Sequence, residues 1–270
     1  MVIWQADFYK FPSSNPKENV YWELLICDNY GRIVEEANCL QSQVNSAWLI
    51  EKLQPLLETE KPEKIQVFRP QSLNLLTLAG KELDIPIEAN RHTTALKQLL
   101  TQRHPDWQSA FKLDQPPPQP VPDNLWGEQW RFAAFPAGEL VDFFRDRPMP
   151  YLHLPEAFFP LTLGIPSTVN IPGVVIYGGR QSRYLAQWLD SISPVSLNFI
   201  PTEVGQSGGM ILEAGLSDRW VLLTFEDAEI AQSGSTFETR KQDTLGLHFL
   251  LVQPDDSGMT YTGFWLLRNS

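Results

Sequence analysis

The sequence predicts an α/β protein with two domains joined by a proline-rich linker, and three observations support this prediction. The chain has 270 residues, whereas single domains cluster near ~100 to 150 residues. Segments with strand periodicity alternate with segments of helical periodicity. Five prolines lie between Pro116 and Pro122, and such a run fits neither a helix nor the interior of a sheet. We therefore expect domains at residues 1–112 and 125–270 and a semi-rigid linker at residues 113–124. A Pro-x-x-Pro ligand for a partner's aromatic groove is the alternative for this run.

The N-terminal domain begins with three predicted strands, the last two joined across Asn29-Tyr30-Gly31 as a hairpin. A helix follows, because Leu49, Leu53 and Leu57 recur at helical spacing, although Pro55 should kink or shorten it. The predicted strands cover residues 2–9, 20–28, 32–39, 64–68 and 85–89, and the predicted helices cover residues 45–58, 71–83 and 93–104. The resulting order, β-β-β-α-β-α-β-α, is that of a ribonuclease-H-like domain, in which parallel strands follow an antiparallel start through right-handed crossovers.

The C-terminal domain is predicted to be a mixed α/β domain that is richer in sheet. Its predicted strands cover residues 129–136, 150–154, 173–179, 196–200, 209–214, 219–225, 247–253 and 262–268, and its predicted helices cover residues 137–144, 182–190 and 236–244. The last of these strands contains Phe264, Trp265, Leu266 and Leu267 within six residues of the chain end. Chain ends are usually frayed and polar, so this apolar run is predicted either to pack into a core or to bind a partner.

Composition excludes several functional classes. No stretch approaches the roughly 18 apolar residues of a membrane span, and the first residues match neither a signal peptide nor a transit peptide. We therefore expect a cytoplasmic protein. Cys27 and Cys39 are too few for a disulfide framework and lack metal-ligand spacing. The net charge is −11, with 12 basic and 14 acidic side chains in residues 1–112 and 9 and 18 in residues 113–270. This balance argues against a general polyanion binder.

Carboxylates on neighbouring strands raise the possibility of a two-metal nuclease, which the sequence disfavours. Asp7 and Asp28 lie on adjacent predicted strands and Glu51 on the first helix. Two-metal chemistry needs a further carboxylate at the end of the next strand, and Arg69 stands there instead. We interpret the three acids as solvated or hairpin-capping groups. Arg69 follows a strand end, where open α/β sheets bind ligands, so it is predicted either to contact a ligand or to pair locally.

Two further segments are locally basic. Residues 89–105 contain Arg91, Lys97 and Arg103 and no acid, which suits a site for phosphate groups, although an amphipathic helix with an incidentally basic face explains the pattern as well. At Gly178-Gly179 a strand runs towards a helix, and Arg180 and Arg183 follow the two glycines. Free backbone N–H groups at such a turn bind phosphate, but the turn lacks nucleotide-binding spacing and a plain βα turn is the alternative. Ser207 lies in a glycine-rich loop without the spacing of a nucleophile elbow, so no enzymatic activity is expected.

Several segments resemble one known family. They are WQADFY, WELLICD, IQVFRPQ, NRHTTAL, IPGVVIYGGR, KQDTLGLHFLLVQPD and GFWLLR. Together they resemble the RNA-binding translation factors for the photosystem I reaction-centre subunit mRNA, formerly catalogued as a domain of unknown function. The resemblance spans both domains, and it is to the compact form expected in oxygenic phototrophic bacteria, without the transit peptide of chloroplast relatives.

The resemblance implies binding to the leader of a photosystem mRNA, promotion of its translation and no cofactor. In this family the near-terminal Trp-Leu-Leu segment is associated with RNA binding, and it falls on residues 265–267. The expected RNA contacts are Arg69, Arg91, Lys97, Arg180, Arg183, Lys241, Trp265, Leu266, Leu267 and Arg268. Either Phe264 or Trp265 is expected to stack on an unpaired base, or Trp265 and Leu267 are expected to face inward from a closing strand.

Two other functions stay open at this point. One is a photosystem assembly factor that binds proteins, with the ribosome or assembly proteins as partners, because most of the acidity lies in the C-terminal domain. The other is a metal-dependent nuclease descended from a ribonuclease-H-like fold, whose activity would be lost on Asp7→Asn.

Overall fold

The computed structural model describes residues 2–10, 20–105, 116–125, 127–203 and 205–269. The chain divides into two compact units, residues 1–114 and 115–270, and each is described by itself. The predicted linker begins outside the described residues. Within the part of the chain that is described, no helix combines the length and the apolar composition that a membrane crossing requires.

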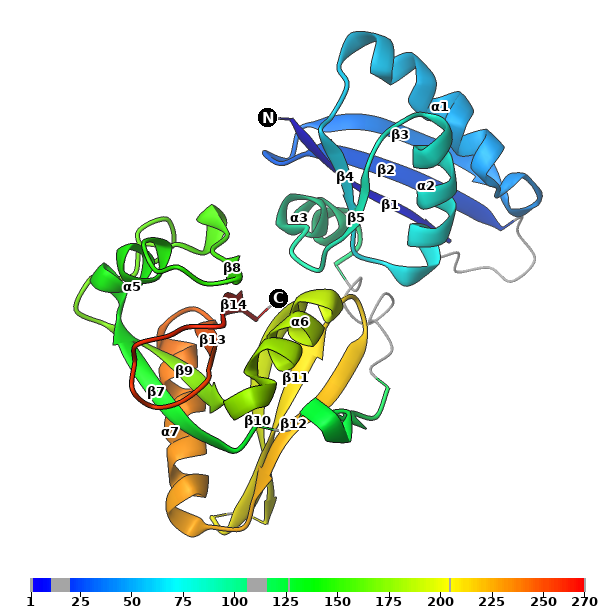
Figure 1. Ribbon diagram of the computed structural model, residues 1–270. Coiled ribbons are helices and arrows are strands. Elements are labelled where there is room, and N and C mark those ends of the chain that lie inside the picture. The colour runs from blue at the N-terminus through cyan, green and yellow to red at the C-terminus, as the bar shows by residue number, and fades with distance from the viewer. Residues whose placement is uncertain (1, 11–19, 106–115, 126, 204, 270) are drawn as a thin grey trace. The chain divides into compact units, whose positions relative to one another are not determined.

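Unit 1 is a five-stranded sheet with helices on both faces (Figure 1). Its elements are β1 (Ile3–Lys10), β2 (Tyr21–Asp28), β3 (Ile33–Leu40), α1 (Ser46–Thr59), β4 (Lys64–Val67), α2 (Pro70–Glu82), β5 (Ile87–Ala89) and α3 (Thr94–Arg103). The strand order is β3-β2-β1-β4-β5. β1 runs antiparallel to β2 and parallel to β4, and β5 runs parallel to β4. The predicted element order is therefore confirmed, while the ribonuclease-H-like assignment stays a prediction.

Side-chain alternation along β1 separates the two faces of this sheet. Trp4, Ala6 and Phe8 enter the core that α1 and α2 complete, whereas Tyr9 enters the smaller core under α3. The strand is thus buried on both faces, as expected for a central strand covered by helices on each side. Asp7 lies on the same face as Tyr9 by this alternation, which places a carboxylate inside the domain.

The prediction that Pro55 shortens the first helix is wrong. α1 continues through Pro55 to Thr59. Proline removes one backbone hydrogen bond from a helix interior, but Leu49 and Leu53 are fully buried in the main core of unit 1 and Leu57 packs against it. Packing of this apolar stripe keeps the helix continuous, because most helical stability in a protein comes from tertiary contacts.

Unit 2 contains two sheets and three α-helices among its described residues. The first sheet has the order β7-β9-β13-β14-β8 and the second has the order β10-β11-β12-β6. The strands are β6 (Gln119–Pro120), β7 (Gln129–Pro136), β8 (Tyr151–His153), β9 (Asn170–Tyr177), β10 (Pro194–Glu203), β11 (Ser207–Ala214), β12 (Asp218–Phe225), β13 (Leu247–Gln253) and β14 (Gly263–Arg268). The helices are α5 (Ala137–Arg145), α6 (Ser182–Ile192) and α7 (Ala228–Asp243).

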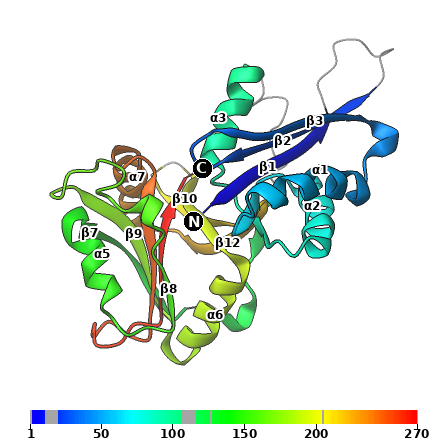
Figure 2. The same ribbon diagram turned by 90° about the horizontal axis from the view of Figure 1, so that it is seen from above.

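The terminal strand β14 lies between two cores. It pairs with β13 on one side and with β8 on the other, so it is an inner strand. Trp265 and Leu267 enter the core shared with α6 and α7. Phe264 and Leu266 enter the opposite core, which contains α5 residues. Figure 2 shows α5 and α6 with the strands of this sheet between them. Because side chains alternate along a strand, neighbouring residues of β14 face opposite sides of the sheet. Both sides are covered by a hydrophobic core, so neither is exposed to solvent.

Two elements of unit 2 differ from the sequence prediction. α7 begins at Ala228 and not at residue 236, because the Asp227 side chain accepts hydrogen bonds from the N–H groups of Glu229 and Ile230 and starts the helix earlier. The described part of the predicted linker packs within unit 2: β6 pairs with β12 and Val121 is buried. Proline is tolerated there because β6 is an edge strand.

Candidate functional site

A buried charge cluster lies where β1, β4 and the start of α2 meet. The Asp7 carboxylate is fully buried and Arg69 is 8% exposed. Arg69 Nε donates to both Asp7 oxygens at 3.0 and 3.1 Å, and Arg69 Nη2 donates to Oδ2 at 2.7 Å. Ser72 Oγ donates to Asp7 Oδ1 at 2.8 Å. Arg69 is the N-cap residue of α2 and is followed by Pro70 at N1. Proline favours the first position of a helix, so α2 begins directly after β4 and holds Arg69 at the end of that strand.

This geometry favours local pairing over ligand contact for Arg69. Both oxygens of the Asp7 carboxylate accept hydrogen bonds from the Arg69 guanidinium. Guanidinium groups commonly bind carboxylates in this two-pronged way. Among the described residues, no three His, Cys, Asp or Glu side chains gather closely enough to hold a metal ion. The positive charge that pairs with Asp7 is the Arg69 guanidinium.

Two other basic residues of unit 1, Arg91 and Lys97, lie near the same corner. The guanidinium of Arg69 lies 5.1 Å and the ammonium of Lys97 lies 5.5 Å from the centroid of the Phe68 ring. Burial, and then the charge of Arg91, lowers the pKa of Lys97. Arg91 itself is 7% exposed. The structure thus brings Arg69, Arg91 and Lys97 into one cluster, of which Lys97 is the half-buried outer member.

Arg103 belongs to a separate ionic network. Its Nη1 donates to Glu23 Oε1 and its Nη2 to Glu36 Oε2, each at 2.6 Å. Tyr9 Oη donates to the other oxygen of Glu23 at 2.7 Å. α3 is therefore fastened to β2 and β3 through its last turn. Within the basic segment 89–105, Arg103 therefore pairs with acids of the same domain and has a structural role.

The two glycine N–H groups of the turn before α6 already have hydrogen-bond partners. Gly178 N–H donates to the carbonyl of Gln253 at 2.8 Å, and Gly179 N–H donates to that of Pro254 at 2.9 Å. Gly179 has a φ of +52°, and a Cβ there would meet the Glu128 carboxylate. A phosphate at this backbone would therefore have to displace two hydrogen bonds and approach an acid. These contacts favour the plain βα turn over a phosphate site.

Three side chains that follow the two glycines, those of Arg180, Arg183 and Tyr184, are exposed to solvent. Arg180 and Arg183 are exposed, and neither has an ion-pair or hydrogen-bond partner among the described residues. Tyr184, next to Arg183, is 61% exposed. The buried stripe of α6 consists of Leu185, Ala186 and Leu189 with Ser182. Arg183 and Tyr184 in its first turn, and Arg180 in the 3-10 turn directly before it, therefore project outward.

Lys241 serves a structural purpose in this conformation. It is 2% exposed, and its Nζ donates to Leu197 O at 2.7 Å, to Asn198 Oδ1 at 2.9 Å and to Glu238 Oε1 at 2.8 Å. All three ammonium hydrogens are satisfied, so Lys241 ties α7 to β10. Burial lowers the pKa of Lys241. Arg268 is half-buried, and its Nε donates to Leu245 O at 3.1 Å.

The Trp-Leu-Leu segment is inside unit 2. Trp265, Leu266 and Leu267 are each 2% exposed. The imidazole of His153 lies parallel to the Trp265 indole, with centroids 5.9 Å apart and an interplanar angle of 9°. His153 Nε2 in turn lies 2.6 Å from Asp190 Oδ1, within hydrogen-bond distance. A buried indole offers no face to a base, so the structure favours the closing-strand alternative over direct stacking for this residue.

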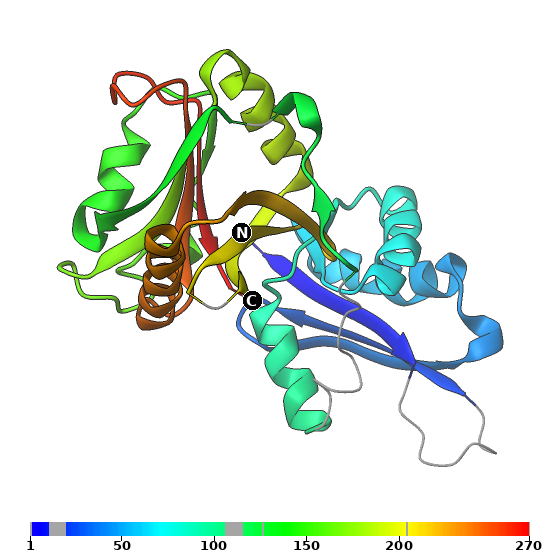
Figure 3. The same cartoon turned by 90° about the horizontal axis from the view of Figure 1, so that it is seen from below.

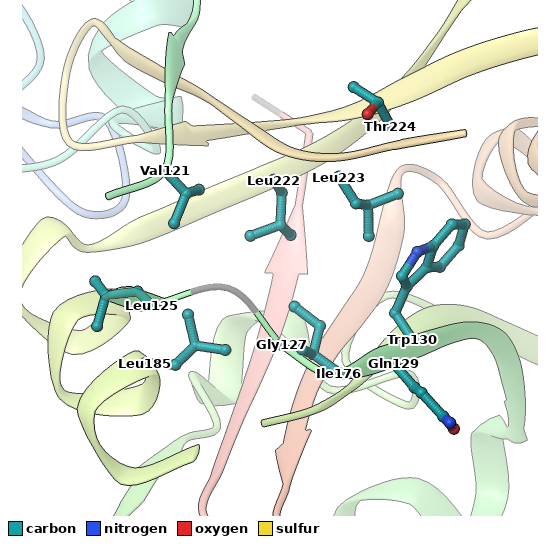
Figure 4. A pocket seen from close by; sticks show the side chains of 10 residues that line it. All are labelled: Val121, Leu125, Gly127, Gln129, Trp130, Ile176, Leu185, Leu222, Leu223 and Thr224. Atoms are coloured by element: carbon teal, nitrogen blue, oxygen red, sulfur yellow. The ribbon is translucent and has the colours of Figure 1, made fainter. Parts of the chain in front are cut away.

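Unit 2 also contains an apolar pocket of about 230 Å³ between α6, β7 and β12. In Figure 4, Leu222 and Leu223 of β12 stand on one side of it, and Leu125, Leu185 and Ile176 stand on the other. A register shift opposite Met210 and Ile211 lets neighbouring leucines of β12 line the same pocket. Its described lining contains no charged side chain, so the pocket offers no cation to a phosphate.

Two exposed arginines of unit 2 were missed by the sequence reasoning. Arg131 on β7 and Arg240 on α7 both line a groove beside the first sheet. They are more than 100 residues apart in the chain, and each lies in an ordinary amphipathic pattern. Their exposure in an otherwise acidic unit is a tertiary property that no local motif signals.

Comparison with known proteins matches both units. Residues 3–103 match the family described as RNA-binding protein Tab2/Atab2 N terminal, and residues 108–268 match its C-terminal domain. The chain is 29% identical to the chloroplastic TAB2 homolog of Arabidopsis thaliana, over 98% of this chain and 74% of that protein. It is 26% identical to that of Zea mays, over 98% and 70%. A likeness to the HTLV-2 integrase catalytic core, at 14% identity over 42% of this chain and 75% of that one, has a TM-score of 0.27 and supports no inference.

Proposed function

The chain belongs to the Tab2/Atab2 family of RNA-binding proteins, and from this membership we propose that it is an RNA-binding translation factor. Its proposed target is the leader of a photosystem I reaction-centre mRNA, and its proposed place of action is the cytoplasm of a phototrophic cell. The family membership supports RNA binding, and the sequence resemblance supports the target. The factor acts on photosystem biogenesis through translation of that message.

The observation that carries this proposal is the exposed start of α6 together with the 3-10 turn directly before it. Arg180, Arg183 and Tyr184 are exposed, and the two arginines have no acidic partner among the described residues. Single-stranded RNA is bound by cations that contact phosphates together with aromatic rings on which bases stack. The net charge of −11 makes unpaired cations the places where a phosphate backbone meets least repulsion.

The proposed function does not include catalysis. A two-metal nuclease requires carboxylates that are free to bind metal ions, and Asp7 already accepts hydrogen bonds from Arg69 and Ser72. The same pair supports a structural role for this corner of unit 1. Lys97, at its outer rim, is the member of the cluster best placed to contact RNA.

The test is filter binding of the purified chain to the photosystem I leader and to an unrelated RNA of equal length at several salt concentrations. We expect tighter binding of the leader. The double variant Arg180→Ala/Arg183→Ala should lower affinity about 10-fold and reduce the salt slope by about 1.4, because each single-stranded phosphate contact contributes about 0.7. Arg145→Ala is the matched control, since Arg145 is exposed but lies 3.8 Å from Asp142.

Equal affinity for the two RNAs would refute the proposed leader, and no binding at low salt would refute RNA binding altogether. The protein-binding alternative makes the opposite prediction for purification from cells. Partners that bind the protein directly survive ribonuclease treatment, whereas partners held through RNA are lost.

A further inference from the structure

Helix α6 carries a second aromatic ring one turn beyond Tyr184. Trp188 follows four residues later on the same helix, and side chains at this spacing are neighbours with Cβ atoms ~5 to 6 Å apart. Tyr184 is 61% exposed, whereas Trp188 is half-buried at the margin of the core that α6 and α7 share. We call these two residues the α6 ring pair. Figure 3 shows α6, in yellow-green, at the margin of unit 2.

A third ring, from another element, holds Trp188 in place. The indole of Trp220 on β12 has its centroid 5.2 Å from that of Trp188, with an interplanar angle of 84°. In this edge-to-face geometry Trp220 occupies one side of Trp188. Among the described residues no ring contact joins Tyr184 to Trp188, so neither ring of the pair covers the other. Stacking of a base needs one face of a ring, which a half-buried indole can still offer.

The charges along α6 suit a phosphate backbone. Residues 180–188 include two arginines and no acid. The next acid on the helix, Asp190, has its Oδ1 2.6 Å from Nε2 of His153. On the other side of the two arginines, the Glu128 carboxylate lies beside Gly179. A backbone held by the arginines therefore meets less repulsion when it continues along α6 than when it turns back over the glycines.

The far end of this path is acidic. Asp218, at the start of β12, is exposed and lies near Gly215 and the last turn of α6. A phosphate that passed Trp188 would approach this carboxylate. The favourable stretch thus begins at Arg180 and ends at the Trp188 ring.

We propose that Trp188 is a second base-stacking ring, so that a single RNA strand anchored by Arg180 and Arg183 places one base on Tyr184 and another on Trp188. The proposal rests on the RNA binding proposed above and extends that site along α6 by one helical turn. Trp188 contributes stacking and no charge. Because Trp220 already limits the movement of the Trp188 ring, little side-chain entropy is lost when a base binds.

The experiment measures binding of the full chain to a 12-nucleotide oligouridylate that carries one central 2-aminopurine, whose fluorescence falls when the base stacks. Trp188→Leu should lower affinity about 10-fold, as expected for the loss of one stacked base, and should reduce the quenching. Its salt slope should equal that of wild type, because stacking releases no counterions, whereas Arg180→Ala/Arg183→Ala reduces the slope.

Two further variants separate stacking from packing. Trp188→Phe keeps a ring and should retain most of the affinity and of the quenching. Tyr30→Leu removes a ring of unit 1 that is 89% exposed and should bind like wild type. Binding is measured at a temperature at which circular dichroism shows each variant to be folded. Equal losses for Trp188→Leu and Trp188→Phe, with quenching unchanged, would indicate a structural role and overturn the inference.

The remaining outcomes separate this inference from the function it rests on. If the wild type binds and Arg180→Ala/Arg183→Ala weakens binding, but Trp188→Leu binds within twofold of wild type with the same quenching, the inference about Trp188 is overturned alone. If the wild type binds no RNA at low salt, both are overturned.

Discussion

Replacing Trp265 with alanine should destabilise unit 2 strongly. The indole is 2% exposed and lies in the core shared with α6 and α7, with His153 stacked on it. Removal of a buried tryptophan costs ~3 to 5 kcal/mol, against a total stability of ~5 to 15 kcal/mol for a domain. A unit of this size loses ~2 to 4 °C of melting temperature per kcal/mol. The expected fall is therefore roughly 6 to 20 °C.

The neighbouring glycine makes the packing of this indole specific. A Cβ at Gly263 would lie 2.5 to 2.7 Å from atoms of the Trp265 ring, so the ring occupies the space that a side chain at Gly263 would take. Trp265→Phe should retain part of the core and produce a smaller fall than alanine. This second variant keeps the test informative if Trp265→Ala does not fold.

The assay is thermal unfolding followed by circular dichroism, with leader binding measured at a temperature where both proteins are folded. Tyr184→Ala is the control, because it removes an aromatic ring that is 61% exposed and should shift melting by less than about 2 °C. A base-stacking Trp265 would instead lose about 10- to 100-fold in RNA affinity with almost unchanged melting. A melting shift below about 2 °C for Trp265→Ala would refute the buried-strand reasoning.

Three further predictions concern unit 1. Asp7→Ala should lower the free energy of unfolding in urea by ~3 to 5 kcal/mol, because it leaves buried Arg69 unpaired. The double variant Asp7→Ala/Arg69→Met should recover much of this stability, and additive losses in the two single variants would contradict the prediction. Burial, and then the charge of Arg91, lowers the pKa of Lys97 in the folded protein. The contribution of Lys97 to the free energy of unfolding therefore rises with pH towards 10.5 and is lost as pH falls through the lowered pKa. Lys97→Met should therefore melt higher than wild type at pH 7, with a gap that narrows near pH 10, while binding RNA more weakly; a constant gap would refute the assignment. Burial raises the pKa of Cys27 to about 12, so iodoacetamide at pH 8 should label it only after unfolding, and labelling of the folded chain would disprove this.

The sequence alone was sufficient for the positions of most elements. The predicted strand at residues 129–136 is β7 and the predicted strand at 247–253 is β13, with the same ends. The order of elements in unit 1 was also predicted. These features follow from local periodicity and turn residues, such as the positive-φ Gly31 in the hairpin between β2 and β3. Local patterns specify them because the neighbours that matter are close in the chain.

The roles of individual cations needed the tertiary structure. Lys241 and Arg183 are equivalent in sequence terms, since each lies on an amphipathic helix of unit 2. Folding buries Lys241 against Leu197, Asn198 and Glu238 and leaves Arg183 exposed. Because whether a charge is paired depends on residues distant in the chain, no local pattern distinguishes a structural cation from one available to a ligand.

The terminal strand shows the same division. Its sequence determined that Phe264 and Trp265 face opposite sides of a sheet, because side chains alternate along a strand. Only the fold decided that both sides are covered, by placing β14 between β13 and β8 and by setting α5 on one face and α6 and α7 on the other. Burial of a face is a property of what packs against it, and those elements are encoded up to about 125 residues earlier in the chain.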